Sequence, residues 1–175
     1  MNLYQRWIFT STGSKSIKVS RGTIICEMIY LGADHRGFKL KEYIKKRLSE
    51  DELEFVDKGD LVLDPEDDYV DFAKLVASEV IQDEKHRGVL ICGSGVGVDM
   101  VANKIDGVRC ALVGDAARAE QSRQHEDVNV IALPSDILEE ETGYQIVKAF
   151  LNTPFSGEER HVRRLEKMKE VEETH

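Results

Sequence analysis

The sequence predicts an α/β domain with three layers, in which helices cover both faces of a parallel sheet. Two observations lead to this prediction. Short runs rich in Val, Ile and Leu alternate five times with longer amphipathic stretches. The short runs are apolar without interruption, which is typical of strands buried on both faces of a parallel sheet. We therefore expect a three-layer α/β/α sandwich with a Rossmann-like five-stranded parallel sheet and a C-terminal helix.

Each element follows from the same pattern. The predicted strands lie at 28–33, 53–57, 88–92, 109–113 and 129–133. The predicted helices lie at 38–50, 69–83, 96–104, 115–125 and 137–151, with a charged C-terminal helix at 158–172. The strand order 2-1-3-4-5 is common in such sheets and is the order we expect.

Composition limits the class of protein. The 175 residues include 24 Lys and Arg against 33 Asp and Glu, for a net charge of -9. This acidic balance disfavours nucleic acid as a partner, and no apolar run approaches the roughly 20 residues of a membrane span. The three cysteines, Cys26, Cys92 and Cys110, form no C-x-x-C pair, which suits a reducing compartment. We expect a cytoplasmic protein that binds a small molecule and needs no structural metal.

Residues 1–27 differ in composition from the rest of the chain. They are rich in Ser and Thr and contain a single acidic residue, Glu27, against four basic ones. Met28 stands immediately before the first predicted strand. We expect residues 1–27 to be an extension that is disordered or not native, and residues 28–175 to form the domain. A transit peptide is the alternative.

Two loops of unusual composition are predicted to meet at one edge of the sheet. In an open parallel sheet the ligand crevice lies beyond the carboxyl ends of the strands, where the strand order reverses. For the expected order this point falls between the first and third strands. It brings loop 32–37, GADHRG, beside loop 92–97, CGSGVG. The sequence therefore predicts a functional site between these loops.

Cys92 is the central candidate in this site. It ends an apolar strand and precedes glycines 93, 95 and 97, which open a helix. Backbone amides in such a turn can point at an anion, and their field favours an ionised thiol. Cys92 is therefore a candidate base or nucleophile. The alternative is a small buried core residue at a strand end.

The glycine loop also admits two rival interpretations. It lacks the last spacing of G-x-G-x-x-G and follows the third strand, so a dinucleotide site is the weaker hypothesis, although Asp115 lies near the distance expected for a ribose-binding acid. A phosphatase loop needs an arginine about five residues after its cysteine, a position near which Val98 stands. Phosphatase chemistry is disfavoured.

Asp34 and His35 follow the first strand at the same edge. A carboxylate and an imidazole there can handle hydroxyl protons or orient a sugar. Alternatively, Asp34 caps the next helix and His35 is simply exposed. His125, near the end of the helix before the fifth strand, can act as an acid or base or can merely complement the helix dipole.

Arg160 and Arg164 fall on one face of the C-terminal helix. Two guanidinium groups at this spacing are suited to gripping a phosphate. The alternative is a solvated helix in which Glu159 and Glu166 are their partners.

Five segments, taken together, resemble a known family. They are GADHRGFKLKEYI, DYVDFA, GVLICGSGVGVDMVANKIDGVRCAL, SRQHEDVNVIAL and FSGEERHVRRLEKM, in this order. The chain over about 28–170 is similar to the ribose-5-phosphate isomerase B and galactose-6-phosphate isomerase family. This resemblance implies interconversion of an aldose phosphate and a ketose phosphate without metal or cofactor. It also implies a homodimer or tetramer whose sites combine residues from two subunits.

The resemblance further implies a role for each matching residue. Cys92 matches the base that moves a proton between C2 and C1. Asp34 matches a carboxylate near the ring oxygen, and His125 matches the histidine that opens the ring, supplied by the partner subunit. Ser94 takes the place of a Thr or Ser in the loop whose amides stabilise the enediolate. The positions that match substrate or phosphate contacts are His35, Tyr69, Gly93, Gly95, Gly97, Arg160 and Arg164.

Three positions depart from the family pattern. Glu126 stands where an asparagine usually touches substrate hydroxyls, and Asp136 stands where an arginine usually helps to hold phosphate. The usual D-Y-P is D-Y-V at 68–70. Because acids repel an incoming phosphate, either the substrate differs from ribose 5-phosphate or the phosphate rests on Arg160 and Arg164 alone.

Three hypotheses of function follow. The first is an aldose-ketose isomerase that uses Cys92 as its base, acting on ribose 5-phosphate and ribulose 5-phosphate or on a related pentose or hexose phosphate. The second is a sugar-phosphate or nucleotide binding module on the same scaffold, its activity lost through Glu126 and Asp136. A dinucleotide enzyme is the third.

Overall fold

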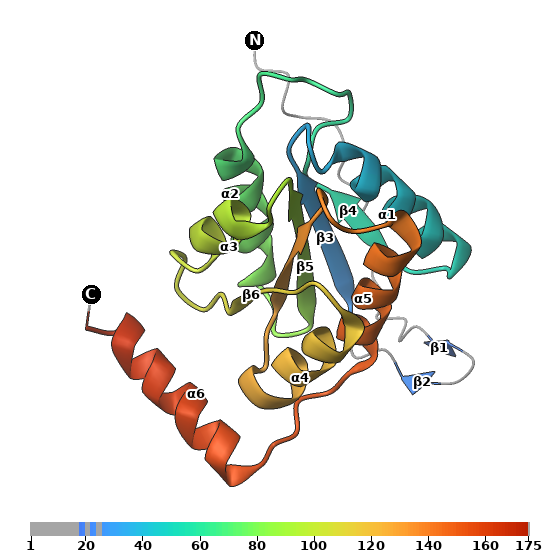
Figure 1. The fold of residues 1–175 in the computed structure, drawn as a ribbon. Coiled ribbons are helices and arrows are strands. Elements are labelled where there is room, and N and C mark those ends of the chain that lie inside the picture. The colour runs from blue at the N-terminus through green and yellow to red at the C-terminus, as the bar shows by residue number, and fades with distance from the viewer. Residues whose placement is uncertain (1–17, 20–21, 24–25, 175) are drawn as a thin grey trace.

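A parallel sheet forms the centre of the protein (Figure 1). The computed structural model describes residues 18–19, 22–23 and 26–174. The strands of the sheet are β3 (Met28–Ala33), β4 (Phe55–Asp57), β5 (His86–Cys92), β6 (Cys110–Leu112) and β7 (Val130–Pro134). Their spatial order is β4-β3-β5-β7-β6, and every pair is parallel.

Helices cover both faces of this sheet. They are α1 (Phe38–Glu50), α2 (Tyr69–Val80), α3 (Val96–Ala102), α4 (Ala116–Glu126) and α5 (Glu140–Asn152). The C-terminal helix α6 (Glu159–Glu172) extends away from the sheet (Figure 1). Buried residues of α1, α4 and α5 form one core, and those of α2 and α3 form the other. The predicted three-layer fold is confirmed. Within the described ranges, no helix is long and apolar enough to cross a membrane.

Helix α1 illustrates why the pattern predicts the elements well. Leu40, Ile44 and Leu48 recur every four residues, so they share one face, and all three are buried against the sheet. The predicted range of this helix, 38–50, is the observed one. The other predicted helices and strands of the domain lie within three residues of their observed bounds.

The predicted order of the last two strands is wrong. Counted along the chain from β3, the order is 2-1-3-5-4, because β7 pairs with β5 and leaves β6 at the edge. The cause lies in burial: all five residues of β7 are buried, whereas the three of β6 are partly or fully exposed. A longer apolar strand gains more from the interior position than a short one. The reversal point between β3 and β5 is nevertheless where we expected it.

The chain before the domain is described only in part. A short antiparallel pair joins β1 (Lys18–Val19) to β2 (Gly22–Thr23). Cys26 packs against the core of α1, α4 and α5, and the Glu27 N–H donates to the Lys85 carbonyl at 3.1 Å. The remaining positions of the predicted extension lie outside the described residues, and the domain boundary at Met28 stays a prediction.

Candidate active site

Three loops meet at the carboxyl edge of the sheet. They follow β3, β5 and β7, and backbone hydrogen bonds join them. The Ser135 N–H donates to the Cys92 carbonyl at 3.0 Å, and the Asp136 N–H donates to the Gly93 carbonyl at 2.9 Å. The Ser135 hydroxyl lies 3.1 Å from the Arg36 carbonyl and 3.0 Å from that of Cys92. The first two loops meet as predicted, and the third joins them.

Cys92 ends β5 at the centre of this edge. Its side chain is 5% exposed and packs with the core of α2 and α3. The Gly95 N–H donates to its sulfur at 3.2 Å, which requires the turn of the glycine loop. Gly95 has a φ of 75°, a left-handed conformation that favours glycine. The sulfur is therefore both buried and hydrogen-bonded to a backbone amide.

The glycine loop is covered by a tyrosine. Tyr69 begins α2, where the Asp68 carboxylate accepts from the Val70 N–H at 3.0 Å and fixes the start of the helix. The Tyr69 ring lies so close to Gly97 that a Cβ there would be 2.7 Å from it. Ser94 is exposed, and its hydroxyl accepts from the Val96 N–H at 3.3 Å. Tyr69 thus lies against the Cys92 loop, of which Ser94 is a part.

Asp34 follows β3 and is 6% exposed. One carboxylate oxygen accepts from the Gly37 N–H at 2.9 Å and closes the turn before α1. The N-cap of α1 is Gly37, so Asp34 is not the cap residue of that helix. Burial raises the pKa of this carboxyl, and the Gly37 hydrogen bond opposes the rise. A carboxyl in such surroundings can accept or return a hydroxyl proton near neutral pH more readily than an exposed one.

His35 has a partner that sequence reasoning missed. Its Nδ1 lies 2.6 Å from Asp67 Oδ1, although the two residues are 32 positions apart. The Asp67 side chain is 4% exposed, and its Oδ2 has no hydrogen-bond partner among the described residues. The hydrogen bond with Asp67 raises the pKa of His35. The imidazole is therefore oriented, with Nε2 left for another contact. Its pairing with an acid also identifies Asp67, at the turn before α2, as part of the site.

Asp136 is paired as well. Its Oδ2 accepts from an Arg36 terminal nitrogen at 2.7 Å, which joins the β7 loop to the β3 loop. The negative charge that the sequence places at this position is therefore balanced by a cation of the same site.

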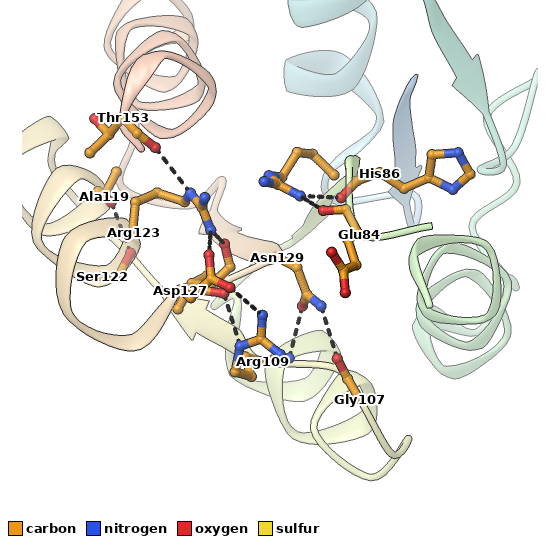
Figure 2. A network of polar contacts seen from close by, with 12 residues as sticks. Glu84, His86, Gly107, Arg109, Ala119, Ser122, Arg123, Asp127, Asn129 and Thr153 are labelled. Atoms are coloured by element: carbon orange, nitrogen blue, oxygen red, sulfur yellow. Dashed lines mark hydrogen bonds and ion pairs between the residues drawn. The ribbon is translucent and has the colours of Figure 1, made fainter. Parts of the chain in front are cut away.

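His125 lies elsewhere, at the end of α4. Asp127 ends this helix with a φ of 46°, a left-handed conformation that costs energy for a residue other than glycine. Figure 2 shows what holds it: Arg109 and Arg123 converge on the Asp127 carboxylate, at 2.9 and 2.7 Å. Arg123 also donates to the Val128 carbonyl at 2.6 Å. This network fixes the turn that follows His125 and Glu126.

The same region holds the start of α6. The His125 ring packs against the ring of His161, with centroids 4.4 Å apart. His161 is 1% exposed, and its Nδ1 lies 2.7 Å from the Ser156 hydroxyl. Arg160 pairs with Glu158 at 2.8 Å, not with Glu159 or Glu166, and Arg164 is exposed.

Within one chain, the two groups of candidate residues lie at opposite ends of the parallel strands. Cys92 pairs with Pro134 at the carboxyl end of β7, whereas His125 precedes the amino end of β7 at Val130. Five strand residues span about 16 Å. The structure thus brings Asp34, His35, Tyr69 and Cys92 together, and leaves His125 apart from them. Glu126, Arg160 and Arg164 lie on the side of His125. No cluster of His, Cys, Asp or Glu suited to a metal occurs in the described ranges.

The fold defines a doubly wound α/β protein, a class in which ligands bind beyond the carboxyl ends of the strands where the strand order reverses. Residues 29–168 match the model of the Ribose/Galactose Isomerase family, and the chain belongs to that family. It is an aldose-ketose isomerase by that membership, and the resemblance seen in the sequence is confirmed.

Individual relatives agree with this assignment. The chain is 37% identical over 147 residues to ribose-5-phosphate isomerase B of Mycobacterium tuberculosis, covering 84% of this chain and 91% of the relative. It matches the structure of ribose-5-phosphate isomerase B from Mycoplasma genitalium with bound ribulose 5-phosphate, with a TM-score of 0.80 and 41% identity, over 83% of this chain and 96% of the other. The type B enzyme of Trypanosoma cruzi matches with a TM-score of 0.81 and 40% identity, over 86% and 99%.

Proposed function

We propose that this protein interconverts ribose 5-phosphate and ribulose 5-phosphate, with Cys92 as the base. The observation that carries the proposal is the position of the Cys92 sulfur at the switch point of the sheet, with the Gly95 N–H directed at it. Family membership and the relative that binds ribulose 5-phosphate support the same substrate pair.

The proposed reaction is a proton transfer. The Cys92 thiolate takes the proton from C2 of the open-chain aldose, and the C–H electron pair forms a double bond between C1 and C2. The carbonyl oxygen at C1 becomes the charged oxygen of an enediolate. The hydroxyl proton on O2 then passes to O1. The Cys92 thiol returns its proton to C1, where the electron pair of the C1–C2 double bond forms the new C–H bond, and a lone pair of O2 forms the C2 carbonyl. This gives the ketose and restores the thiolate. Amides of the glycine loop, from Gly93 to Gly97, stabilise the intermediate by donating to its oxygens.

The remaining roles divide between two subunits. Asp34 contacts the sugar near its ring oxygen, and His125 of a second chain opens the ring. His35, with Arg160 and Arg164 of the second chain, binds the phosphate. The separation of His125 from Cys92 within one chain supports a shared site, because the two can serve one substrate only across a subunit boundary. Glu126 contributes to the choice of sugar, and a cytoplasmic location remains our prediction.

The proposed function is tested with a panel of pentose and hexose phosphates in D2O. We expect the C2 proton of ribose 5-phosphate to exchange with solvent and ribulose 5-phosphate to form, both followed by NMR. Saturable binding without exchange across the whole panel would contradict the proposal and favour a binding module. A rise in melting temperature with NAD alone would favour a dinucleotide enzyme.

The His35 pair predicts a specific pH dependence. Because Asp67 raises the pKa of His35, the imidazolium persists to higher pH, and phosphate affinity falls as the pH rises through that raised pKa. Asp67→Asn keeps the size of the side chain and removes its charge. The pKa of His35 then falls, so the loss of phosphate affinity begins at lower pH. At pH 7.5 we expect a KM about tenfold higher, since a charged hydrogen bond is lost.

The measurement for Asp67→Asn is KM across pH 5 to 9, with the His35 ring proton followed by NMR. The wild type and Asp67→Asn should have the same KM at the acidic end, because His35 is charged in both and the substrate phosphate titrates identically. Superimposable KM profiles over the whole range would show that Asp67 does not act through His35.

A further inference from the structure

Arg36 has the geometry of a substrate-binding residue, although neither its position in the sequence nor the family resemblance gives it a role. It lies in the β3 loop between His35 and Gly37. Its terminal nitrogen donates to Asp136 at 2.7 Å, so a loop 100 positions away holds the guanidinium in place. The Arg36 side chain is 57% exposed, despite this pairing. The group is therefore fixed at one end and open to solvent at the other.

The guanidinium lies against the catalytic loop. A Cβ at Gly93 would collide with Arg36 Nε, so in this position the guanidinium packs directly on the glycine next to Cys92. The Ser135 hydroxyl also links the backbones of the two loops, since it lies within hydrogen-bond distance of the carbonyls of Arg36 and Cys92. Among the described residues, the only hydrogen bond of the guanidinium goes to Asp136. Most of its five N–H donors are thus available to a ligand beside Cys92.

The negative charges near Cys92 favour a cation at this position. The proposed enediolate would form close to the buried carboxylate of Asp34, which is unfavourable without a positive group nearby. The charge of His35 is paired with Asp67. Lys41, in helix α1, is buried and paired with Asp57 at 2.7 Å. Arg36 is the cation that faces the Cys92 loop itself. Its pKa is raised, chiefly by the hydrogen bond and charge of Asp136 and in lesser part by the charge of Asp34.

We infer that Arg36 is a catalytic residue of this site, whose guanidinium donates hydrogen bonds to the charged enediolate oxygen, and that Asp136 is the residue that positions it. The inference rests on the proposed function. The charged oxygen forms when the C2 proton passes to Cys92, so the interaction strengthens as the reaction proceeds.

The test compares Arg36→Met with Arg36→Lys and with a matched surface control. Lys39→Met removes another cation that is paired with an acid, three positions away, where Lys39 contacts Glu140 at 3.1 Å and is 88% exposed. We expect Arg36→Met to lower kcat by about 100-fold with little change in KM, because one donor to a developing oxyanion is lost. Arg36→Lys should retain part of the rate, and Lys39→Met should equal wild type.

A binding measurement separates the two ends of the substrate. Measured by calorimetry, Arg36→Met should weaken the binding of a phosphorylated hydroxamate, which carries an enediolate-like anion. The affinity for inorganic phosphate should not change. Equal weakening of both probes would overturn the inference, because Arg36 would then bind phosphate. Unchanged kcat would overturn it as well. Wild-type protein that isomerises no sugar phosphate would instead overturn the proposed function, and this inference with it.

The positioning role of Asp136 has its own readout. Asp136→Asn should lower kcat by about tenfold while KM stays constant, because the guanidinium remains but is held less firmly. Asp136→Glu should restore part of the rate. In the double variant with Arg36→Met, the Asp136 change should have no further effect. Additive losses would show that Asp136 acts independently of Arg36.

Discussion

Replacing Cys92 with alanine is expected to abolish exchange of the substrate C2 proton with solvent. No other side chain is proposed to take that proton, so the variant should retain less than about one thousandth of the wild-type rate, as for the loss of a unique base. The measurement is proton exchange in D2O by NMR, alongside formation of the ketose. Exchange at a normal rate in Cys92→Ala would remove this sulfur from the mechanism.

The other two cysteines provide matched controls for this experiment. Burial raises the pKa of Cys26 to about 11, and burial together with Asp99 raises the pKa of Cys110 well above its usual value. Both thiols stay protonated at neutral pH and cannot act as a base there. Cys26→Ala and Cys110→Ala should therefore keep the exchange rate. All three variants should melt cooperatively, since each removes only one small side chain.

The fold was predictable because most of its information is local. The buried face of α1, with Leu40, Ile44 and Leu48, is visible in the sequence as a four-residue repeat. The order of β6 and β7 was not, because it depends on how two separate strands compare in length and burial. Composition does not separate the two strands, because 109–113 (RCALV) and 129–133 (NVIAL) each consist of one polar residue followed by four apolar ones.

The site was predictable to the extent that topology controls it. The carboxyl-edge rule brings the loops after β3 and β5 together from sequence alone, and the structure agrees. Contacts between side chains far apart in the sequence follow no such rule. His35 with Asp67, and Arg36 with Asp136, join residues 32 and 100 positions apart. The Asp136 pair also changes the interpretation of that position, because an acid that repels phosphate becomes an acid that holds an arginine.

The position of His125 leads to the second large prediction. Equal amounts of Cys92→Ala and His125→Ala chains, each inactive alone, should recover about a quarter of the wild-type activity after they are unfolded and refolded together. In a two-fold dimer, half of the random pairs are hybrids, and each hybrid has one complete site. That site takes Cys92 from one chain and His125 from the other.

The control is a mixture of Cys92→Ala with a chain that carries both changes, refolded together. No pair of chains in this mixture combines an intact Cys92 with an intact His125, so it should stay inactive. Activity is measured by ketose formation, and the assembly by light scattering. If both residues served a site within their own chain, no hybrid would contain a complete site, and the mixture would be as inactive as its components. Within one chain, however, the length of β7 separates Cys92 from the His125 turn that Arg109 and Arg123 hold in place. Because closing that distance would require breaking the sheet, recovery in the mixture is the outcome that the geometry predicts.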